Sequence, residues 1–133
     1  MNGLEATAWA YLRERLRDRW QAERLTDRLV KGVPDVVWVR KGSPPLTGFW
    51  ELKATKAPRG KIPWTSPEQP LWLWRWARSG GTAALVTRSD GRWYVWRPRA
   101  DVAWVRWIQE GTVDVWAGAD LVTDKPEEIL EWM

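Results

Sequence analysis

The chain has 133 residues, of which 44% are hydrophobic and 29% are charged, as expected for one domain with its own core. It contains no cysteine and no histidine. These absences exclude disulfides, zinc sites of the Cys/His kind, thiol nucleophiles and histidine general bases. Any catalytic chemistry must therefore come from carboxylates, lysine, hydroxyl groups or a hard metal ion.

Charge is divided unevenly along the chain. Residues 1–100 carry 19 Lys and Arg against 9 Asp and Glu, a net charge of +10, whereas residues 101–133 carry 2 against 8, a net charge of −6. The basic part favours a polyanionic partner such as DNA, and a solvated arginine-rich surface is the plainer alternative. The acidic segment either is a counterweight or docks on a basic face of its own chain or of a partner subunit.

The sequence also bears on the compartment and the source of the protein. No apolar run approaches the ~18 residues of a membrane span, and the first residues do not resemble a signal peptide, so we expect a cytoplasmic protein. The single asparagine, Asn2, and the nine prolines agree with a heat-loving source, although a GC-rich genome produces a similar bias.

The first half of the chain reads as a helix followed by strands. Leu4, Ala8, Leu12 and Leu16 recur every four residues, which predicts an amphipathic helix over residues 3–19. A short strand is predicted around 24–29. A buried strand over 36–39 and a second over 48–54 are predicted to pair antiparallel across a loop at 40–47.

The second half begins with a basic loop over 55–65. Ser66 is expected to cap a helix that has Pro67 in its first turn and ends at Gly80-Gly81. The remaining predictions are a hairpin of strands 82–87 and 93–97, a helix over 100–109, a strand over 112–116 and a terminal helix that opens at Asp124. The whole is an α/β domain, 1–133, with a mixed sheet flanked by helices.

One group of charged residues indicates a candidate catalytic site. Along a strand, Glu51 and Lys53 point to one face while Trp50 and Leu52 point to the other. Asp35 begins the neighbouring strand, and its carboxylate is expected to lie close to the side chains of Glu51 and Lys53. Two converging carboxylates need a cation between them, and oxygen ligands suit Mg²⁺ or Mn²⁺. A lysine beside them can orient an attacking water and offset phosphoryl charge.

With Pro34-Asp35 and Glu51-Leu52-Lys53, the sequence resembles the PD-(D/E)xK nuclease superfamily. The resemblance implies a restriction-endonuclease-like fold over a core of about residues 3–97. It also implies Mg²⁺-dependent hydrolysis of DNA phosphodiesters, with Mn²⁺ as a substitute. Asp35, Glu51 and the backbone carbonyl of Leu52 would then bind the metal, and Lys53 would position the water.

Two further residues are candidates for the same site. Many members of the superfamily add a glutamate from the first helix, and Glu5 is similar in spacing to that of archaeal Holliday junction resolvases; Glu23 is its competitor. Gln69 either faces the site, as a glutamine does in virus-type and phage members, or completes a capping box with Ser66.

The expected DNA contacts come from basic side chains and one aromatic ring. Lys56, Arg59 and Lys61 follow the catalytic strand and would contact flanking phosphates. The arginines of the first helix, above all Arg13 and Arg17, could extend that track, and Trp64 could stack on an exposed base. Most other tryptophans fit core or dimer surfaces better.

The preferred function is therefore a structure-selective DNA endonuclease. It looks most like a Holliday junction resolvase, whose two symmetric cuts on branched, four-way DNA imply a homodimer. The alternatives are a flap or nicking nuclease of the VRR type, of phage or repair origin, and a catalytically silent DNA-binding module.

Overall fold

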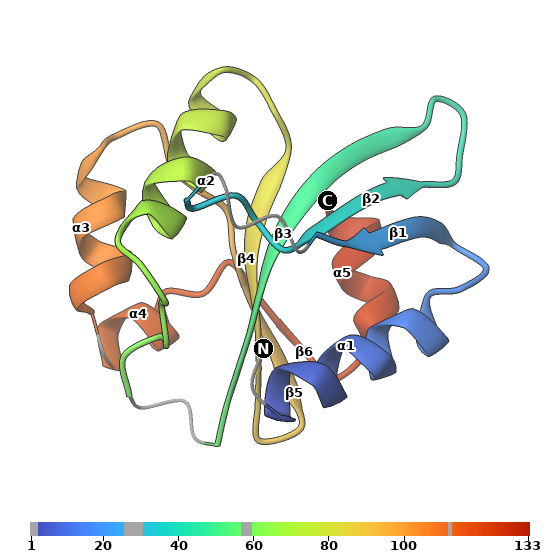
Figure 1. The fold of residues 1–133 in the computed structure, drawn as a ribbon, viewed down its shortest axis with the longest axis horizontal. Coiled ribbons are helices and arrows are strands. Elements are labelled where there is room, and N and C mark those ends of the chain that lie inside the picture. Colours follow the sequence, from blue (N-terminus) through green and yellow to red (C-terminus); the bar gives the residue numbers. More distant parts are fainter. Residues whose placement is uncertain (1–2, 26–30, 57–59, 112) are drawn as a thin grey trace.

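The computed structural model of the chain describes residues 3–25, 31–56, 60–111 and 113–133. Its centre is a six-stranded mixed sheet whose strands lie side by side in chain order (Figure 1). The strands are β1 (Trp20–Arg24), β2 (Val36–Arg40), β3 (Leu46–Thr55), β4 (Ala83–Ser89), β5 (Arg92–Trp96) and β6 (Leu121–Thr123). Neighbouring strands run antiparallel except β3 and β4, which are parallel because the helix α2 connects them by a crossover.

Helices cover both faces of this sheet. They are α1 (Gly3–Arg15), α2 (Glu68–Arg78), α3 (Ala103–Glu110), α4 (Val113–Ala117) and α5 (Pro126–Trp132). Figure 1 shows α1 and α5 on one side of the sheet and α2, α3 and α4 on the other. Each side has its own cluster of buried side chains. The predicted α/β class, the mixed sheet and the flanking helices are thus confirmed.

The side chains of strand β3 point alternately to the two sides of the sheet. Trp50 and Leu52 are fully buried in the cluster beneath α1 and α5. Glu51 and Lys53 point to the opposite side, where α2 lies, as the two-residue period of a strand requires. The predicted division of these four residues between the two faces is confirmed.

The predicted strand over 112–116 is wrong. Residues 113–117 form the short helix α4, and the strand of this region is β6, which the sequence analysis did not identify. Val115 and Trp116 have the side chains of β-formers, but both are buried in the α2–α3 cluster. The Val115 carbonyl also accepts a hydrogen bond from Trp96 Nε1 at 2.9 Å, so tertiary packing overrides local propensity here.

Most predicted boundaries shift by one to four residues, and those of the first helix, the first strand and α2 have a clear physical reason. Helix α1 ends at Arg15, and the strand expected around 24–29 lies earlier, at 20–24, because Trp20 packs into the core; residues 26–29 lie outside the described part. Pro67, rather than Ser66, is the N-cap of α2, with no side-chain cap. The Ser66 side chain instead hydrogen-bonds the Glu68 carboxylate, and this bond lowers the pKa of Glu68.

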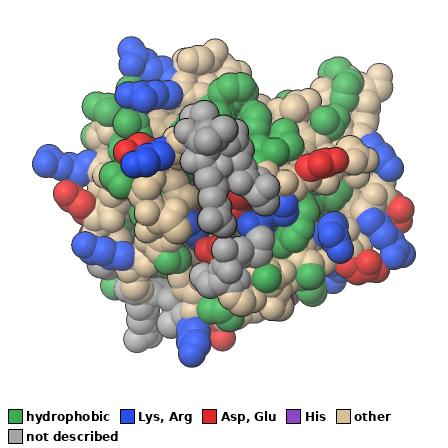
Figure 2. Space-filling model, viewed as in Figure 1, with side chains coloured by type: hydrophobic (Ala, Val, Ile, Leu, Met, Phe, Trp, Pro, Cys, Tyr) green, Lys and Arg blue, Asp and Glu red, His purple; other side chains and the backbone are tan. Residues whose placement is uncertain are grey.

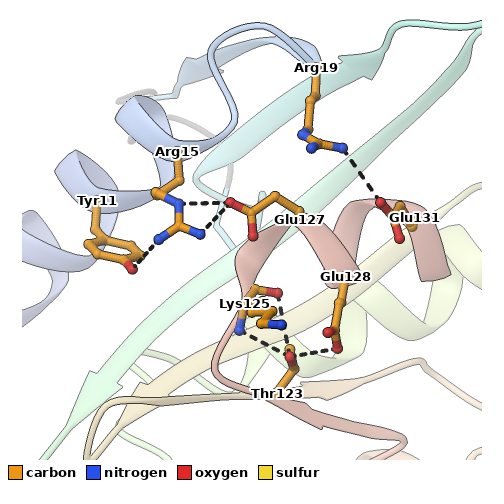
Figure 3. A network of polar contacts seen from close by, with 8 residues as sticks. All are labelled: Tyr11, Arg15, Arg19, Thr123, Lys125, Glu127, Glu128 and Glu131. Atoms are coloured by element: carbon orange, nitrogen blue, oxygen red, sulfur yellow. Dashed lines mark hydrogen bonds and ion pairs between the residues drawn. The ribbon is translucent and has the colours of Figure 1, made fainter.

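The acidic end of the chain docks on arginines at the end of α1 and in the turn that follows it. Arg15 Nη2 lies 2.7 Å from Glu127 Oε1, and Arg19 Nη1 lies 3.5 Å from Glu131 Oε1 (Figure 3). Ile129 of α5 is buried in the same core cluster as α1. Two carboxylates of the acidic segment, those of Glu127 and Glu131, therefore lie on a basic face of their own chain.

Among the described helices, none combines the length and the apolar character that crossing a membrane requires.

Candidate active site

The two halves of the Asp/Glu-x-Lys pattern meet at the start of β2. Pairing between β2 and β3 begins with Val36 opposite Trp50, so Asp35 lies beside the next residues of β3. The backbone N–H of Leu52 donates to Asp35 Oδ1 at 2.9 Å, and the backbone N–H of Asp35 donates to Glu51 Oε2 at 3.3 Å. These reciprocal bonds fix the two carboxylates relative to each other.

Lys53 lies within the same cluster and is almost completely buried. Its Nζ is 3.7 Å from Glu51 Oε1, and only 3% of its side chain is exposed. The Trp64 ring lies 6.0 Å from Nζ and forms part of the surroundings of the ammonium. A buried ammonium next to a carboxylate is well placed to donate a hydrogen bond to a bound water or phosphate.

Gln69 contacts both Glu51 and the backbone just before its own helix. Its Nε2 donates to Glu51 Oε1 at 2.6 Å, and its Oε1 accepts the N–H of Thr65 at 2.9 Å. A capping box would have required a bond to the N–H of Ser66. Gln69 therefore faces the cluster, as the first alternative expects, and its bond to the backbone before the helix goes to Thr65 and not to Ser66.

Glu5 approaches the cluster from α1. It is 8% exposed, and its carboxyl interacts electrostatically with Lys53, Asp35 and Arg24. Glu23, its competitor, lies at an exposed position of β1. The structure thus places Glu5 within electrostatic reach of the cluster, while Glu23 is exposed.

The burial of these carboxyl groups changes their electrostatics. Desolvation, followed by the negative charge of Asp35, raises the pKa of Glu51 to about 8. Desolvation also raises the pKa values of Asp35 and Glu5, although the Leu52 N–H and Arg24 oppose the shift at Asp35 and Lys53 opposes it at Glu5. Carboxyl groups that resist ionisation because of burial and mutual repulsion are stabilised when a cation joins them.

The donor set fits a hard divalent cation. In an extended strand the N–H and C=O of one residue point to the same side, so the carbonyl of Leu52 is directed to the edge where Asp35 lies. Across the described residues, no three Asp, Glu, His or Cys side chains converge into a cage. Asp35, Glu51 and this carbonyl are instead a partial set, which Mg²⁺ typically completes with water and phosphate oxygens.

Arg24, at the end of β1, belongs to the cluster and was missed by the sequence analysis. Its Nη2 lies 3.1 Å from Asp35 Oδ2. The sequence contained one indication of this role. Trp20, Ala22 and Arg24 follow the two-residue period of a strand, so they lie on the face that packs against the core. An arginine at such a position, where an apolar residue is expected, points to a charged partner.

The residues predicted to contact DNA differ in their exposure and in their partners within the chain. Arg13, Arg17, Lys56 and Lys61 are exposed, and Arg17 pairs with its neighbour Glu14 at 2.7 Å. Trp64 is half-buried, and its Nε1 donates to the Ile108 carbonyl at 3.4 Å, so the ring is held against the core. Arg59 lies outside the described residues. Figure 2 shows Lys and Arg side chains dispersed around one face, not gathered into a single track.

Comparisons with protein-family models, with curated proteins and with solved structures find no match to this chain.

Proposed function

We propose that the protein is a metal-dependent DNA endonuclease of the PD-(D/E)xK kind. The observation that carries the proposal is the hydrogen-bonded pairing of Asp35 with Leu52 and Glu51, with the Lys53 ammonium 3.7 Å from Glu51. Two carboxylates, an adjacent carbonyl and a buried lysine are the groups that phosphodiester hydrolysis requires in a chain without histidine or cysteine.

In this proposal each residue has a distinct task. Asp35, Glu51 and the Leu52 carbonyl hold the divalent cation. When bound, the cation supplies Lewis acidity to the phosphoryl group and to a water molecule. Lys53 donates a hydrogen bond that orients the attacking water and offsets developing charge on the phosphate. Gln69 fixes the Glu51 carboxylate through its 2.6 Å bond, so that the carboxylate does not need to reorient during the reaction.

The preferred substrate is branched DNA, above all a four-way junction cut by a homodimer. The contribution of Glu5 to the cluster supports this proposal, because a helix-borne glutamate with this spacing is the feature shared with archaeal-type resolvases.

A flap or nicking nuclease of the VRR type is a second candidate, and one observation favours it. Gln69 points at Glu51, and a glutamine in this place is a feature that virus-type and phage members of the superfamily share. Both candidates use the same cluster, so they differ in substrate and not in chemistry.

The test uses the purified protein with Mg²⁺ or EDTA and four labelled DNAs: a fixed four-way junction, a flap, a single strand and a matched duplex. Paired, symmetric, Mg²⁺-dependent nicks confined to the junction are the expected result. Cutting of the flap or single strand would support the nuclease activity but contradict the four-way junction as its substrate. Binding without cutting in Mg²⁺ or Mn²⁺ would overturn the enzymatic proposal and leave a silent DNA-binding module.

A further inference from the structure

Arg24 is a cation built into the carboxylate cluster. It stands opposite Val36 in the β1–β2 register, and its side chain turns toward α1, with the guanidinium carbon 5.7 Å from the centre of the Trp9 ring. Its Nη2 is 3.1 Å from Asp35 Oδ2, and only 15% of the side chain is exposed. The positive charge of the guanidinium is therefore largely shielded from solvent.

The guanidinium is bonded incompletely. Its Nε and Nη1 are buried, and neither has a hydrogen-bond partner among the described residues. Buried polar groups in native proteins are nearly always satisfied, and each exception costs stability and calls for an explanation. An arginine held by one of its three nitrogens can exchange partners more easily than one that is fully bonded.

Arg24 also lies against the Asp35 oxygen that is most open to a metal ion. Asp35 Oδ1 already accepts the N–H of Leu52, which leaves Oδ2 as the oxygen without a backbone donor, and Arg24 Nη2 lies 3.1 Å from it. The guanidinium and a divalent cation carry like charges, and two cations on one carboxylate oxygen repel each other. A cation that binds Asp35 must therefore displace Arg24 or share the oxygen with it at a cost.

We infer that Arg24 is the resident counter-cation of this site: it competes with the divalent cation for Asp35 and thereby sets the affinity of the site for metal. The inference rests on the proposed function, because it assumes that Asp35 binds a metal ion. Arg24 acts through Asp35 and is a positioning residue, not a catalytic one. In the metal-free protein it stabilises the carboxylate, and in the loaded protein it moves off Oδ2.

The test is calorimetric titration of the full-length, metal-free protein with Ca²⁺ alone, in the absence of DNA. Arg24→Gln is expected to bind Ca²⁺ at least about tenfold more tightly than the wild type, because the competing charge is gone. Arg24→Lys, which keeps the charge, should stay close to the wild type. Arg17→Gln is the matched control: it removes the same charge at an exposed position and should leave the affinity unchanged.

Unchanged or weaker Ca²⁺ binding by Arg24→Gln would overturn the inference. If the wild type nevertheless cuts DNA, the proposed function stands and only the role of Arg24 fails. If no variant binds Ca²⁺ and the wild type cuts none of the four DNAs, both fail together.

A second measurement covers the case in which Arg24→Gln does not fold. The side-chain Nε–H signal of Arg24, assigned through its loss in Arg24→Lys, is followed by NMR in wild-type protein as Ca²⁺ is added. A shift at saturating Ca²⁺ is expected, because the guanidinium leaves Asp35. A signal that does not move would contradict the displacement.

Discussion

Glu51 is the residue whose ionisation the fold changes most visibly. Its pKa rises from an ordinary 4.5 to about 8, chiefly through desolvation. Between these values the folded chain retains a proton that the unfolded chain has released, so folding becomes less favourable as pH rises. The stabilisation is complete below about pH 4.5 and is lost as pH passes the folded-state pKa of about 8.

This linkage predicts that the metal-free protein loses stability between pH 5 and 8, by up to ~1.4 kcal/mol per pH unit from this one group. Glu51→Gln keeps the shape of the side chain but cannot ionise, so its pH profile should be flatter. Urea unfolding in EDTA at several pH values measures both profiles. Parallel profiles for the two proteins would show that Glu51 is not the titrating group.

Gln69 allows a second test at the scale of one side chain. Its bond to Glu51 is lost in Gln69→Ala, and loss of such a supporting bond typically lowers activity by ~10–100-fold. We expect a loss of this size in single-turnover DNA cleavage, with the protein still folded. Gln109→Ala is the control, because its Nε2 also bonds the start of α2, at the Pro67 carbonyl, but not the cluster. Equal rates for both variants would reduce Gln69 to a structural role.

At the scale of elements, sequence patterns were reliable where they reflected burial on one face. The alternation in β2 and β3 predicted their pairing and the common face of Glu51 and Lys53. The pattern failed at 113–117, where Val115 and Trp116 point into a helical cluster that lies far away in sequence. Local propensity contains no information on that packing.

The same limit explains which site residues could be found. Asp35, Glu51 and Lys53 stand in a recognisable pattern, whereas Arg24 is one of many arginines and becomes distinctive only when β1 places it on Asp35. The choice between Glu5 and Glu23 likewise depends on how α1 packs against the sheet, which neither spacing nor charge determines.

The pairing of β2 with β3 depends on one glycine. Gly48 stands opposite Trp38, and a Cβ there would lie 2.4 Å from Trp38 Cζ2. We predict that Gly48→Ala lowers the free energy of unfolding by ~1–3 kcal/mol, the usual cost of overpacking. Gly60→Ala, whose Cβ would meet nothing within 4 Å, is the control. Equal denaturation midpoints for the two variants would disprove the tight contact.

At the scale of the whole molecule, the net charge of +10 over residues 1–100 overstates what is available to DNA. Part of it is used internally, because Arg15 is bound by Glu127 and Arg19 by Glu131 (Figure 3). Exposed cations such as Lys61, which has no such described partner, remain for phosphates.

This division predicts different salt dependences. Lys61→Ala should weaken DNA binding and reduce the slope of log affinity against log salt by about 1, as expected for one lost phosphate contact. Arg15→Ala should leave the slope nearly unchanged, because Glu127 already neutralises that charge. Fluorescence anisotropy over a salt series measures both. A larger change for Arg15→Ala than for Lys61→Ala would contradict this assignment of charges.

The central claim is that Asp35 and Glu51 hold the metal ion for DNA cleavage. The most direct measurement compares cleavage in Mg²⁺ by the wild type with that by Asp35→Asn, on the DNA that the wild type prefers, with binding of each protein measured in Ca²⁺. We predict that Asp35→Asn binds this DNA but does not cut it. Cleavage by Asp35→Asn at the wild-type rate would place the active site elsewhere in the molecule.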